Sequence, residues 1–296
     1  MVLLELFSGI GGFSKGLEAA GYTFDKVYFS EIDKHAVANF KYNFPYAEHI
    51  GTVTEITNAV IERPDIITFG SPCQNFSIAG DGTGLQGKES SLIRYAVEAV
   101  RKFRPDVFIW ENVKGVLFSK HRNDFWSIIQ AFTHIGGYRL EWQLFNTAWF
   151  LPQNRERIYL VGRLAKKCTG DVFPFPAPGG MHGSFGKDAT AASVCGTITK
   201  NYGKQPNIGN YVLCLKPGDV YNGKLTPDQI KGIRMLTEVE CERLQGFPDD
   251  FTKYGKYEKE TKIISWVNRY ALLGNAVSVP VVKAVAARIK KNTAIV

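Results

Sequence analysis

Two apolar stretches of the chain each end in a side chain that could take part in covalent chemistry. Cys73 stands in the sequence Gly-Ser-Pro-Cys-Gln-Asn-Phe-Ser, soon after the apolar run 66–69, and Glu111 directly follows the apolar run 107–110. In open α/β sheets, ligands bind outside the carboxyl ends of the strands. A thiol and a carboxyl group at one such edge suit covalent attack on a pyrimidine ring, in which the acid protonates the ring nitrogen. A lone free cysteine is more often a small buried hydrophobe, and that alternative stays open for Cys73 taken by itself.

Alternating strand and helix signals must position these two groups. The predicted strands are 2–7, 27–30, 65–69, 106–110, 140–147 and 157–162, and the predicted helices are 15–20, 35–42, 91–103 and 124–135. Alternation of this kind indicates βαβ units. We therefore expect an α/β fold with a mostly parallel, doubly wound, Rossmann-like sheet.

The composition of the chain changes after Gly162. Residues 163–233 contain eleven glycines, and nine lysines and arginines against four acidic residues. Short β-like runs at 197–199 and 211–215 argue against a simple linker. We expect a second, smaller domain here, rich in β structure and loops and with a basic surface.

Two further helices are predicted near the end of the sequence. Thr237 and Glu240 form a capping box at the start of a helix over 237–244. The segment 281–290 is amphipathic and is expected to pack back onto the first domain through Val281, Val282, Val285 and Ile289. The predicted domains are 1–162 with about 266–296, and about 163–265.

The bulk properties exclude several classes of protein. A net charge of +8 over 296 residues favours a polyanionic partner. The five cysteines are scattered and form no C-x-x-C pair, which argues for a reducing compartment and against a disulfide framework or structural zinc. The histidines show no ligand spacing, so no metal is proposed. The N-terminus indicates a first strand rather than a signal peptide, and no apolar run is long enough to span a membrane.

A glycine-rich turn after the first predicted strand indicates a cofactor site. Residues 7–12 are Phe-Ser-Gly-Ile-Gly-Gly, and glycines before a helix N-terminus let the backbone approach an anionic ligand. Glu31 ends the second strand about 20 residues further on, where an acid suits a ribose diol. The pattern fits dinucleotides and S-adenosylmethionine, but the missing G-x-G-x-x-G spacing argues against NAD. A purely structural turn is the other interpretation.

Together these residues resemble the cytosine-5 DNA methyltransferase family, over nearly the whole chain and in the family's motif order. The matching runs are Phe7-Ser8-Gly9-Ile10-Gly11-Gly12, Glu31-Ile32-Asp33, Pro72-Cys73-Gln74, Glu111-Asn112-Val113, Gln153-Asn154-Arg155-Glu156-Arg157, Arg243-Leu244-Gln245-Gly246-Phe247-Pro248 and Gly274-Asn275-Ala276-Val277. Seven motifs in order are far more specific than any one of them. The resemblance implies a DNA (cytosine-5-)-methyltransferase with DNA in the cleft between two domains, and a recognition region at 163 to about 233.

The resemblance also implies a task for individual residues, with S-adenosylmethionine as the cofactor. The implied cofactor-binding residues are Phe7, Ser8, Gly9, Ile10, Gly11, Gly12, Glu31, Ile32, Pro72, Leu92, Asn275, Ala276 and Val277. The implied catalytic residues are Cys73, Glu111, Arg155 and Arg157, and the implied DNA-binding residues are Gln74, Ser77, Thr197, Lys200 and Lys204. Arg155 and Arg157 are two residues apart, so on a strand they face the same side. Phe7 and Ile32 either sandwich the adenine or belong to the core.

The implied reaction is methylation of C5 of a cytosine in duplex DNA. The target base must be flipped out, because it cannot be reached inside the duplex. The Cys73 thiolate would add to C6, Glu111 would neutralise the charge at N3, and C5 would then take the methyl group. The expected partner is double-stranded DNA, bound by a monomer with no membrane and no obligate protein partner. A cytoplasmic, nucleoid-associated enzyme fits this interpretation, as does a separately encoded cognate restriction endonuclease.

Three departures from the family pattern bear on binding. The third motif often carries an aspartate that contacts adenine, whereas this chain has Thr52 and Val53 after Gly51. In the fifth motif Glu89 stands near the usual arginine, although Leu92 still matches the cofactor position. The recognition region is also short. We therefore expect weaker phosphate contacts from the glycine-rich loop before Leu92, which is otherwise suited to act as a lid that closes on DNA.

Two rival functions are compatible with the same motifs. One branch of the family keeps them to methylate tRNA, but its usual Cys-Phe-Thr signature is absent from this sequence. A degenerate, non-enzymatic binding module would be expected to lose Cys73, Glu111 or the basic strand, the motif at 153–157, and all three are present. Duplex DNA is therefore the preferred substrate.

Overall fold

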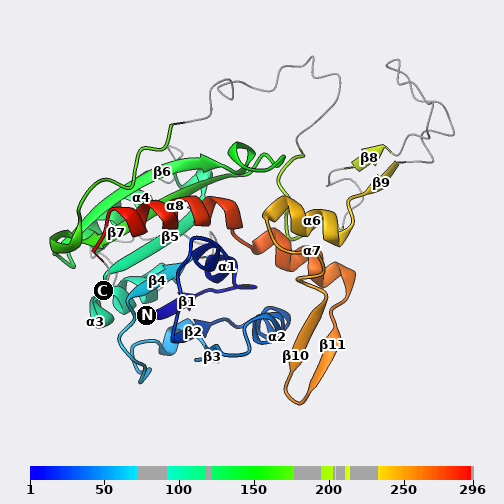
Figure 1. Ribbon diagram of the computed structural model, residues 1–296, viewed down its shortest axis with the longest axis horizontal. Helices are drawn as coiled ribbons and strands as arrows, with labels where there is room; N and C mark the ends of the chain where they lie inside the picture. Colours follow the sequence, from blue (N-terminus) through cyan, green and yellow to red (C-terminus); the bar gives the residue numbers. More distant parts are fainter. Residues whose placement is uncertain are drawn as a thin grey trace.

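A seven-stranded sheet forms the centre of the molecule, with the strand order β3-β2-β1-β4-β5-β7-β6 (Figure 1). The computed structural model describes residues 1–71, 92–117, 122–176, 195–202, 204, 211–213 and 233–294. The strands are β1 (Val2–Leu6), β2 (Lys26–Ser30), β3 (Glu48–His49), β4 (Ile66–Phe69), β5 (Val107–Val113), β6 (Tyr138–Asn146) and β7 (Glu156–Leu164). Strands β1 to β5 pair in parallel, whereas β7 runs antiparallel to both β5 and β6. The predicted α/β fold with a mostly parallel sheet is confirmed.

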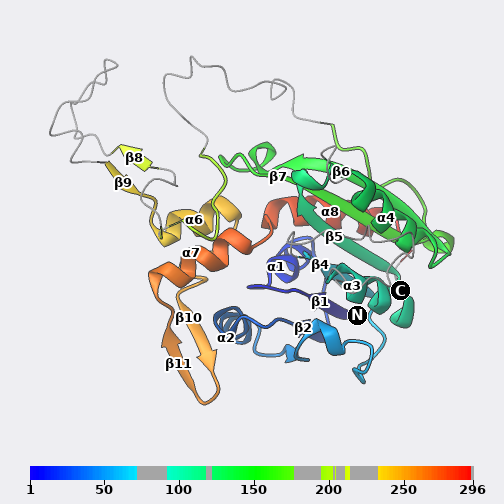
Figure 2. The same cartoon turned by 180° about the vertical axis from the view of Figure 1, so that it is seen from behind.

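Helices pack on both faces of this sheet (Figures 1 and 2). One face is covered by α1 (Gly12–Ala19), α2 (Lys34–Asn43) and α8 (Val279–Lys291), and the other by α3 (Ile93–Phe103) and α4 (Arg122–Thr133). Helix α7 (Trp266–Asn275) packs against α6 (Glu238–Gln245) and α2 beyond the sheet. Successive strand residues point to opposite faces. Ile109 accordingly joins the first apolar cluster, and its neighbours Phe108 and Trp110 join the second. Both faces are buried, which explains why these strands are almost wholly apolar.

The last helix, α8, packs directly on the first helix, α1, as the amphipathic pattern predicted. Val281, Val282, Val285 and Ile289 are all buried. A Cβ atom on Gly16 of α1 would lie 2.4 Å from Cγ1 of Val282, so only glycine allows the two helices to approach this closely. Helices distant in the sequence thus complete one face of the sheet together.

One more helix and two small sheets come after the central sheet in the chain. Helix α6 (Glu238–Gln245) begins at the N-cap Thr237, and the predicted capping box with Glu240 is present. Strand β8 (Tyr211–Leu213) pairs with β9 (Ile233–Met235), and β10 (Tyr254–Tyr257) forms a hairpin with β11 (Glu260–Ile263). The predicted β-like run at 211–215 is therefore confirmed for 211–213, while 214 and 215 lie outside the described residues.

One predicted strand is wrong. Residues 197–199 form no strand, although Thr and Ile favour β structure. The adjoining Cys195 makes a single isolated bridge to Gln153, and the chain then turns at Lys200. Hydrogen bonds from Cys195 and Thr197 to residues 152–154 fix this segment and outweigh its local propensity for β structure.

A buried arginine joins the segment after β7 to the end of the chain. Arg163 is fully buried, and its guanidinium donates to the carbonyl oxygens of Asn292 and Gly170 and pairs with the Glu141 carboxylate. The other Glu141 oxygen accepts the backbone N–H of Val172 at 2.9 Å. The chain therefore stays attached to the edge of the central sheet for several residues after β7 ends.

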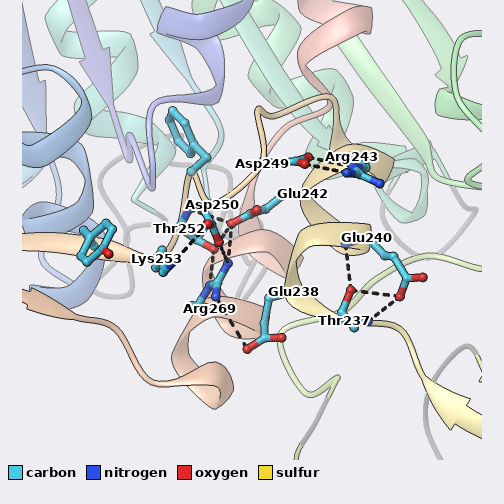
Figure 3. Close-up of polar contacts among 12 residues, drawn as sticks. Thr237, Glu238, Glu240, Glu242, Arg243, Asp249, Asp250, Thr252, Lys253 and Arg269 are labelled. Carbon is cyan, nitrogen blue, oxygen red and sulfur yellow. Dashed lines mark hydrogen bonds and ion pairs between the residues drawn. The ribbon is translucent and has the colours of Figure 1, made fainter.

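Buried charges also join α6 to α7 (Figure 3). Glu242 is fully buried, and its Oε1 accepts from the Thr252 backbone N–H at 2.8 Å and from Nη2 of Arg269 at 3.0 Å. Arg269 belongs to α7, so one carboxylate holds two helices and the intervening loop. The span Trp266–Lys291, the one stretch of the described residues long and apolar enough to cross a membrane, consists of α7 and α8 and is mostly buried inside the protein.

Candidate active site

A pocket of about 630 Å³ opens at the carboxyl ends of the parallel strands. Its lining includes three groups of predicted residues. These are Phe7, Gly9, Glu31, Ile32, Leu92 and Asn275 of the cofactor set, Glu111, Arg155 and Arg157 of the catalytic set, and Lys200 of the DNA set. Ligands bind at this edge of open α/β sheets, so the structure brings these ten predicted residues together where the fold favours it.

The glycine-rich turn and Glu31 form one end of the pocket. Gly9 has a φ of +54°, and its backbone N–H donates to Oε2 of Glu31 at 2.8 Å. The other carboxylate oxygen accepts from the backbone N–H groups of Ile32 and Asp33 at 2.7 and 2.9 Å. The side chain of Ile32 is 80% exposed, which decides that it is not a core residue. This end therefore presents a fixed carboxylate beside a free apolar surface.

The remaining residues of the turn shape it rather than line the pocket. Ser8 and Ile10 are buried, and a Cβ on Gly11 would lie 2.4 Å from the ring of Phe44. A Cβ on Gly12 would lie 2.6 Å from a methyl group of Val277. The last predicted motif thus packs against the first, with Asn275 in the pocket wall.

A buried acid below the turn was not predicted from the sequence. Helix α1 has Gly11 as its N-cap, which offers no side-chain acceptor. The fully buried Glu5 carboxylate takes that place, accepting from the backbone N–H and the hydroxyl of Ser14 at 3.1 and 2.5 Å. Burial raises the pKa of Glu5 to about 8. Since Glu5 lies within an apolar strand, no spacing signal marks its role.

Glu111 and Arg157 form an ion pair at the other end of the pocket. Both are largely buried, and Nε of Arg157 lies 3.1 Å from Oε1 of Glu111. Burial raises the pKa of the Glu111 carboxyl, while the charges of Arg157 and Arg155 oppose that rise. Burial thus favours the protonated form of Glu111, and a protonated acid in this place can share its proton with a ring nitrogen.

Arg155 lines the same pocket, but its guanidinium donates hydrogen bonds to backbone carbonyls. Its guanidinium donates to the carbonyl oxygens of Ala276 at 2.7 Å, Ile198 at 3.2 Å and Gly274 at 3.3 Å. Burial and the nearby Arg157 lower the pKa of Arg155 to about 9. Arg155 therefore fixes three chain segments around the pocket, a function that the two-residue spacing alone did not reveal.

The strand that leads to the predicted nucleophile is held against β5. The Ser71 carbonyl accepts from Nδ2 of Asn112 at 3.1 Å, and its hydroxyl accepts from Nε1 of Trp110 at the same distance. Ser71 itself lines the pocket. Four predicted residues, Pro72, Cys73, Gln74 and Ser77, follow directly and lie outside the described residues.

The predicted DNA-binding residues of the recognition region do not share one surface. The Thr197 hydroxyl donates to the Asn154 carbonyl at 2.7 Å and so faces the basic strand. Lys200 lines the pocket, whereas Lys204 is exposed and does not line it.

His35 and Asn268 line the pocket, although no sequence pattern predicted that they would. Nδ1 of His35 lies 2.6 Å from the Tyr257 hydroxyl, and Nε2 lies 3.1 Å from Nδ2 of Asn268. Residues of α2, α7 and the β10–β11 hairpin thus meet at the rim. Only the folded chain brings them together. Among the described residues, no group of three or more histidines, cysteines and acids is arranged to hold a metal ion.

Comparison with known proteins decides the family. A model of the C-5 cytosine-specific DNA methylase family matches residues 1–179 and 184–291. The chain belongs to the C-5 cytosine-specific DNA methylase family. The match covers the pocket and all but four residues of the predicted recognition region, so the predicted enzyme class is confirmed.

Curated relatives of this methylase cover almost the whole chain. It is 34% identical to the type II methyltransferase M.HaeII of Haemophilus aegyptius over 96% of this chain and 91% of that protein. It is 33% identical to the type II methyltransferase M.NgoBI of Neisseria gonorrhoeae over 95% and 90% of the two chains.

Solved structures confirm the fold of the methylase. The Dnmt2 methyltransferase of S. pombe superposes with a TM-score of 0.69 at 21% identity, covering 98% of this chain and 99% of that one. The Entamoeba histolytica methyltransferase EhMeth gives the same TM-score at 18% identity, with 98% of each chain covered. At such identities the likeness shows the shared architecture alone.

Proposed function

We propose that this methylase transfers a methyl group from S-adenosylmethionine to C5 of a cytosine flipped out of duplex DNA. The observation that carries the proposal is the composition of one pocket. Glu111 and Arg157 form a buried acid–cation pair at one end, and the Gly9–Glu31 turn forms the other. A flipped-out cytosine and a methyl donor can therefore bind next to each other within a single site.

The cofactor end of the pocket fits an adenosine. The Glu31 carboxylate, held by the Gly9 N–H, is an acceptor suited to a ribose diol, and the exposed Ile32 side chain offers an apolar surface to an adenine face. When bound, S-adenosylmethionine would supply an electrophilic sulfonium methyl group. The chain's own residues would bind and orient it through Phe7, Leu92 and Asn275, which also line the pocket.

The base end of the pocket suits covalent activation of cytosine. The Cys73 thiolate adds to C6 and forms an S–C6 bond, while Glu111 provides a proton at N3 so that no charge is left on the ring. C5 becomes nucleophilic and would take the methyl group of the bound cofactor, whose sulfonium sulfur would leave as a neutral thioether. Solvent water then takes the C5 proton, the S–C6 bond breaks to release the Cys73 thiolate, and the N3 proton returns to Glu111. Arg157 orients the Glu111 carboxyl throughout, and Arg155 acts by fixing the pocket walls.

The same proposal covers the organisation and setting of the enzyme. Residues 1–162 with about 266–296 would bind the cofactor and carry catalysis, and about 163–265 would recognise the DNA site. We expect a monomer on double-stranded DNA in the cytoplasm, associated with the nucleoid through DNA. The type II names of the relatives favour a place in a restriction–modification system, with the endonuclease encoded separately.

Bisulfite sequencing of DNA from cells that express the protein tests this function. Wild-type protein should protect cytosines at one short sequence from conversion, whereas Cys73→Ser should protect none, because a hydroxyl is a far poorer nucleophile near neutral pH. The variant should still bind the cofactor. Methylation of tRNA with no mark on DNA would overturn the proposal in favour of the tRNA branch, and normal methylation by Cys73→Ser would remove the covalent step.

A further inference from the structure

Residues 195–202, which we call the strap, attach to residues 152–154, just before β7. The Cys195 N–H donates to the Pro152 carbonyl at 2.9 Å, and the Cys195 carbonyl accepts from the Asn154 N–H at 2.8 Å. The Thr197 hydroxyl completes this edge with its bond to the Asn154 carbonyl. The strap therefore runs beside the segment that carries Arg155 and Arg157.

The other side of the strap is pressed against the end of α7. A Cβ on Gly274 would lie 2.2 Å from the backbone nitrogen of Lys200 and 2.3 Å from the carbonyl carbon of Thr199. Arg155 reaches across to the Ile198 carbonyl, and the buried Tyr202 accepts the Leu236 N–H on its hydroxyl at 2.9 Å. Contacts on both sides thus fix the backbone position of Lys200.

Among the lysines and arginines of the pocket wall, Lys200 is the one whose side chain has no hydrogen-bond or ion-pair partner among the described residues. Arg157 is paired with Glu111, and Arg155 donates to three carbonyls. The Lys200 side chain is exposed at the pocket mouth, and it forms no hydrogen bond or ion pair with the residues that the structure describes. A fixed backbone with a free ammonium group at a pocket mouth suits an anion that arrives with the substrate.

We propose that Lys200 contacts a backbone phosphate next to the extruded cytosine and so stabilises the flipped-out state. This inference rests on the proposed function. A nucleotide whose N3 reaches Glu111 carries its sugar and phosphates to the pocket mouth, where Lys200 lies. The contact would form only after extrusion, so its free energy would favour the extruded nucleotide over the stacked one. Lys204, outside the pocket, would instead meet phosphates regardless of extrusion.

Single-turnover methylation at saturating DNA separates these two roles. The duplex carries the site found by bisulfite sequencing, and a second duplex carries 2-aminopurine in place of the target cytosine to report extrusion by fluorescence. Lys200→Ala should lower the single-turnover rate about tenfold or more, the factor expected for a lost charge-assisted hydrogen bond, and reduce the fluorescence rise. Lys200→Arg should restore most of both signals.

Two variants provide matched controls. Lys166 is an exposed lysine beyond the far end of β7, so Lys166→Ala removes one positive charge and should leave the rate and the fluorescence unchanged. Lys204→Ala should weaken binding to all duplexes and lower the salt dependence, with a smaller effect on the saturated rate than Lys200→Ala.

A duplex with an abasic position opposite the target tests the mechanism directly. Extrusion costs less there, so the defect of Lys200→Ala should shrink. Equal rates for Lys200→Ala and Lys166→Ala on the normal duplex would overturn the role of Lys200 while leaving the proposed function intact. A wild-type protein that does not methylate DNA would instead overturn the proposed function itself.

Discussion

At the scale of single residues, Glu31 combines two tasks that can be separated by substitution. Its carboxylate holds the glycine turn through the Gly9 N–H and, in our proposal, accepts from the ribose of the cofactor. Glu31→Ala should weaken S-adenosylmethionine binding roughly tenfold or more, because a charge-assisted hydrogen bond contributes about 1.5–3 kcal/mol. Titration calorimetry measures this directly. Glu31→Gln keeps an acceptor for Gly9, so wild-type affinity in both variants would show that the carboxylate does not bind the ribose.

Glu111 offers a second test at this scale. Glu111→Gln keeps the size of the side chain but cannot provide a proton, so turnover should fall by about 10²-fold or more. Cofactor affinity should be unchanged. Because burial raises the pKa of Glu111, the wild-type rate should fall as the pH rises through that pKa, and the fall should be absent from the residual activity of the variant. A variant with full activity would exclude Glu111 as the acid.

Glu5 predicts a pH dependence of stability. Its pKa in the folded protein is about 8, against 4.5 for an ordinary glutamate. The folded state therefore holds a proton that the unfolded chain loses, and this contribution to stability is lost as the pH rises from about 4.5 to about 8. Glu5→Gln cannot titrate, so its free energy of unfolding should vary less over that range. Urea unfolding at several pH values measures the difference, and parallel curves for the two proteins would contradict it.

At the scale of elements, Gly274 sets how closely α7 approaches the strap. A methyl group there would overlap backbone atoms of Thr199 and Lys200, and backbone cannot move aside as a flexible side chain can. Gly274→Ala should destabilise the protein by about 1–3 kcal/mol and slow methylation, because the pocket walls move apart. Gly115→Ala is a matched control, since its new methyl would lie 3.6 Å from Val113, an ordinary contact. Thermal unfolding of the two variants should differ clearly; equal stabilities would contradict the close packing.

The elements also show how far sequence patterns reach. Apolar runs predicted six of the seven strands of the central sheet but not the two-residue β3, and Glu111, which was predicted to follow a strand, lies within β5 and lines the pocket. The β10–β11 hairpin escaped prediction, because β11 is exposed throughout and carries no alternation of apolar and polar residues. The roles of buried charged residues such as Glu5 and Arg163 were not predicted either, since their partners are distant in the sequence. Likewise, the contacts made by 195–202 come from 152–155 and Gly274, which no local pattern could reveal.

At the scale of the whole molecule, our proposal assigns recognition and part of the pocket wall to one stretch of chain. The strap belongs by sequence to the recognition region, yet it forms part of the pocket wall. An exchange of 205–232 for the matching segment of a relative, with the strap retained, should change the methylated site and keep activity. Bisulfite sequencing of the chimera shows the outcome. An active chimera with the original site would place recognition elsewhere in the chain.

The pairing of α1 with α8 joins the beginning of the chain to its end, so a break in the middle would divide the pocket between two fragments. A break between Phe175 and Cys195 would leave Glu111 and the arginines on one fragment and the strap, α7 and α8 on the other. The two fragments would meet again along the α1–α8 contact, the Arg155 hydrogen bonds and the Arg163 bonds to Asn292. Assembly of such a split enzyme would be bimolecular, so DNA marking would depend on the product of two fragment concentrations. The fold thus lends itself to a genetic AND gate, in which a heritable mark appears only in cells where two promoters have been active together.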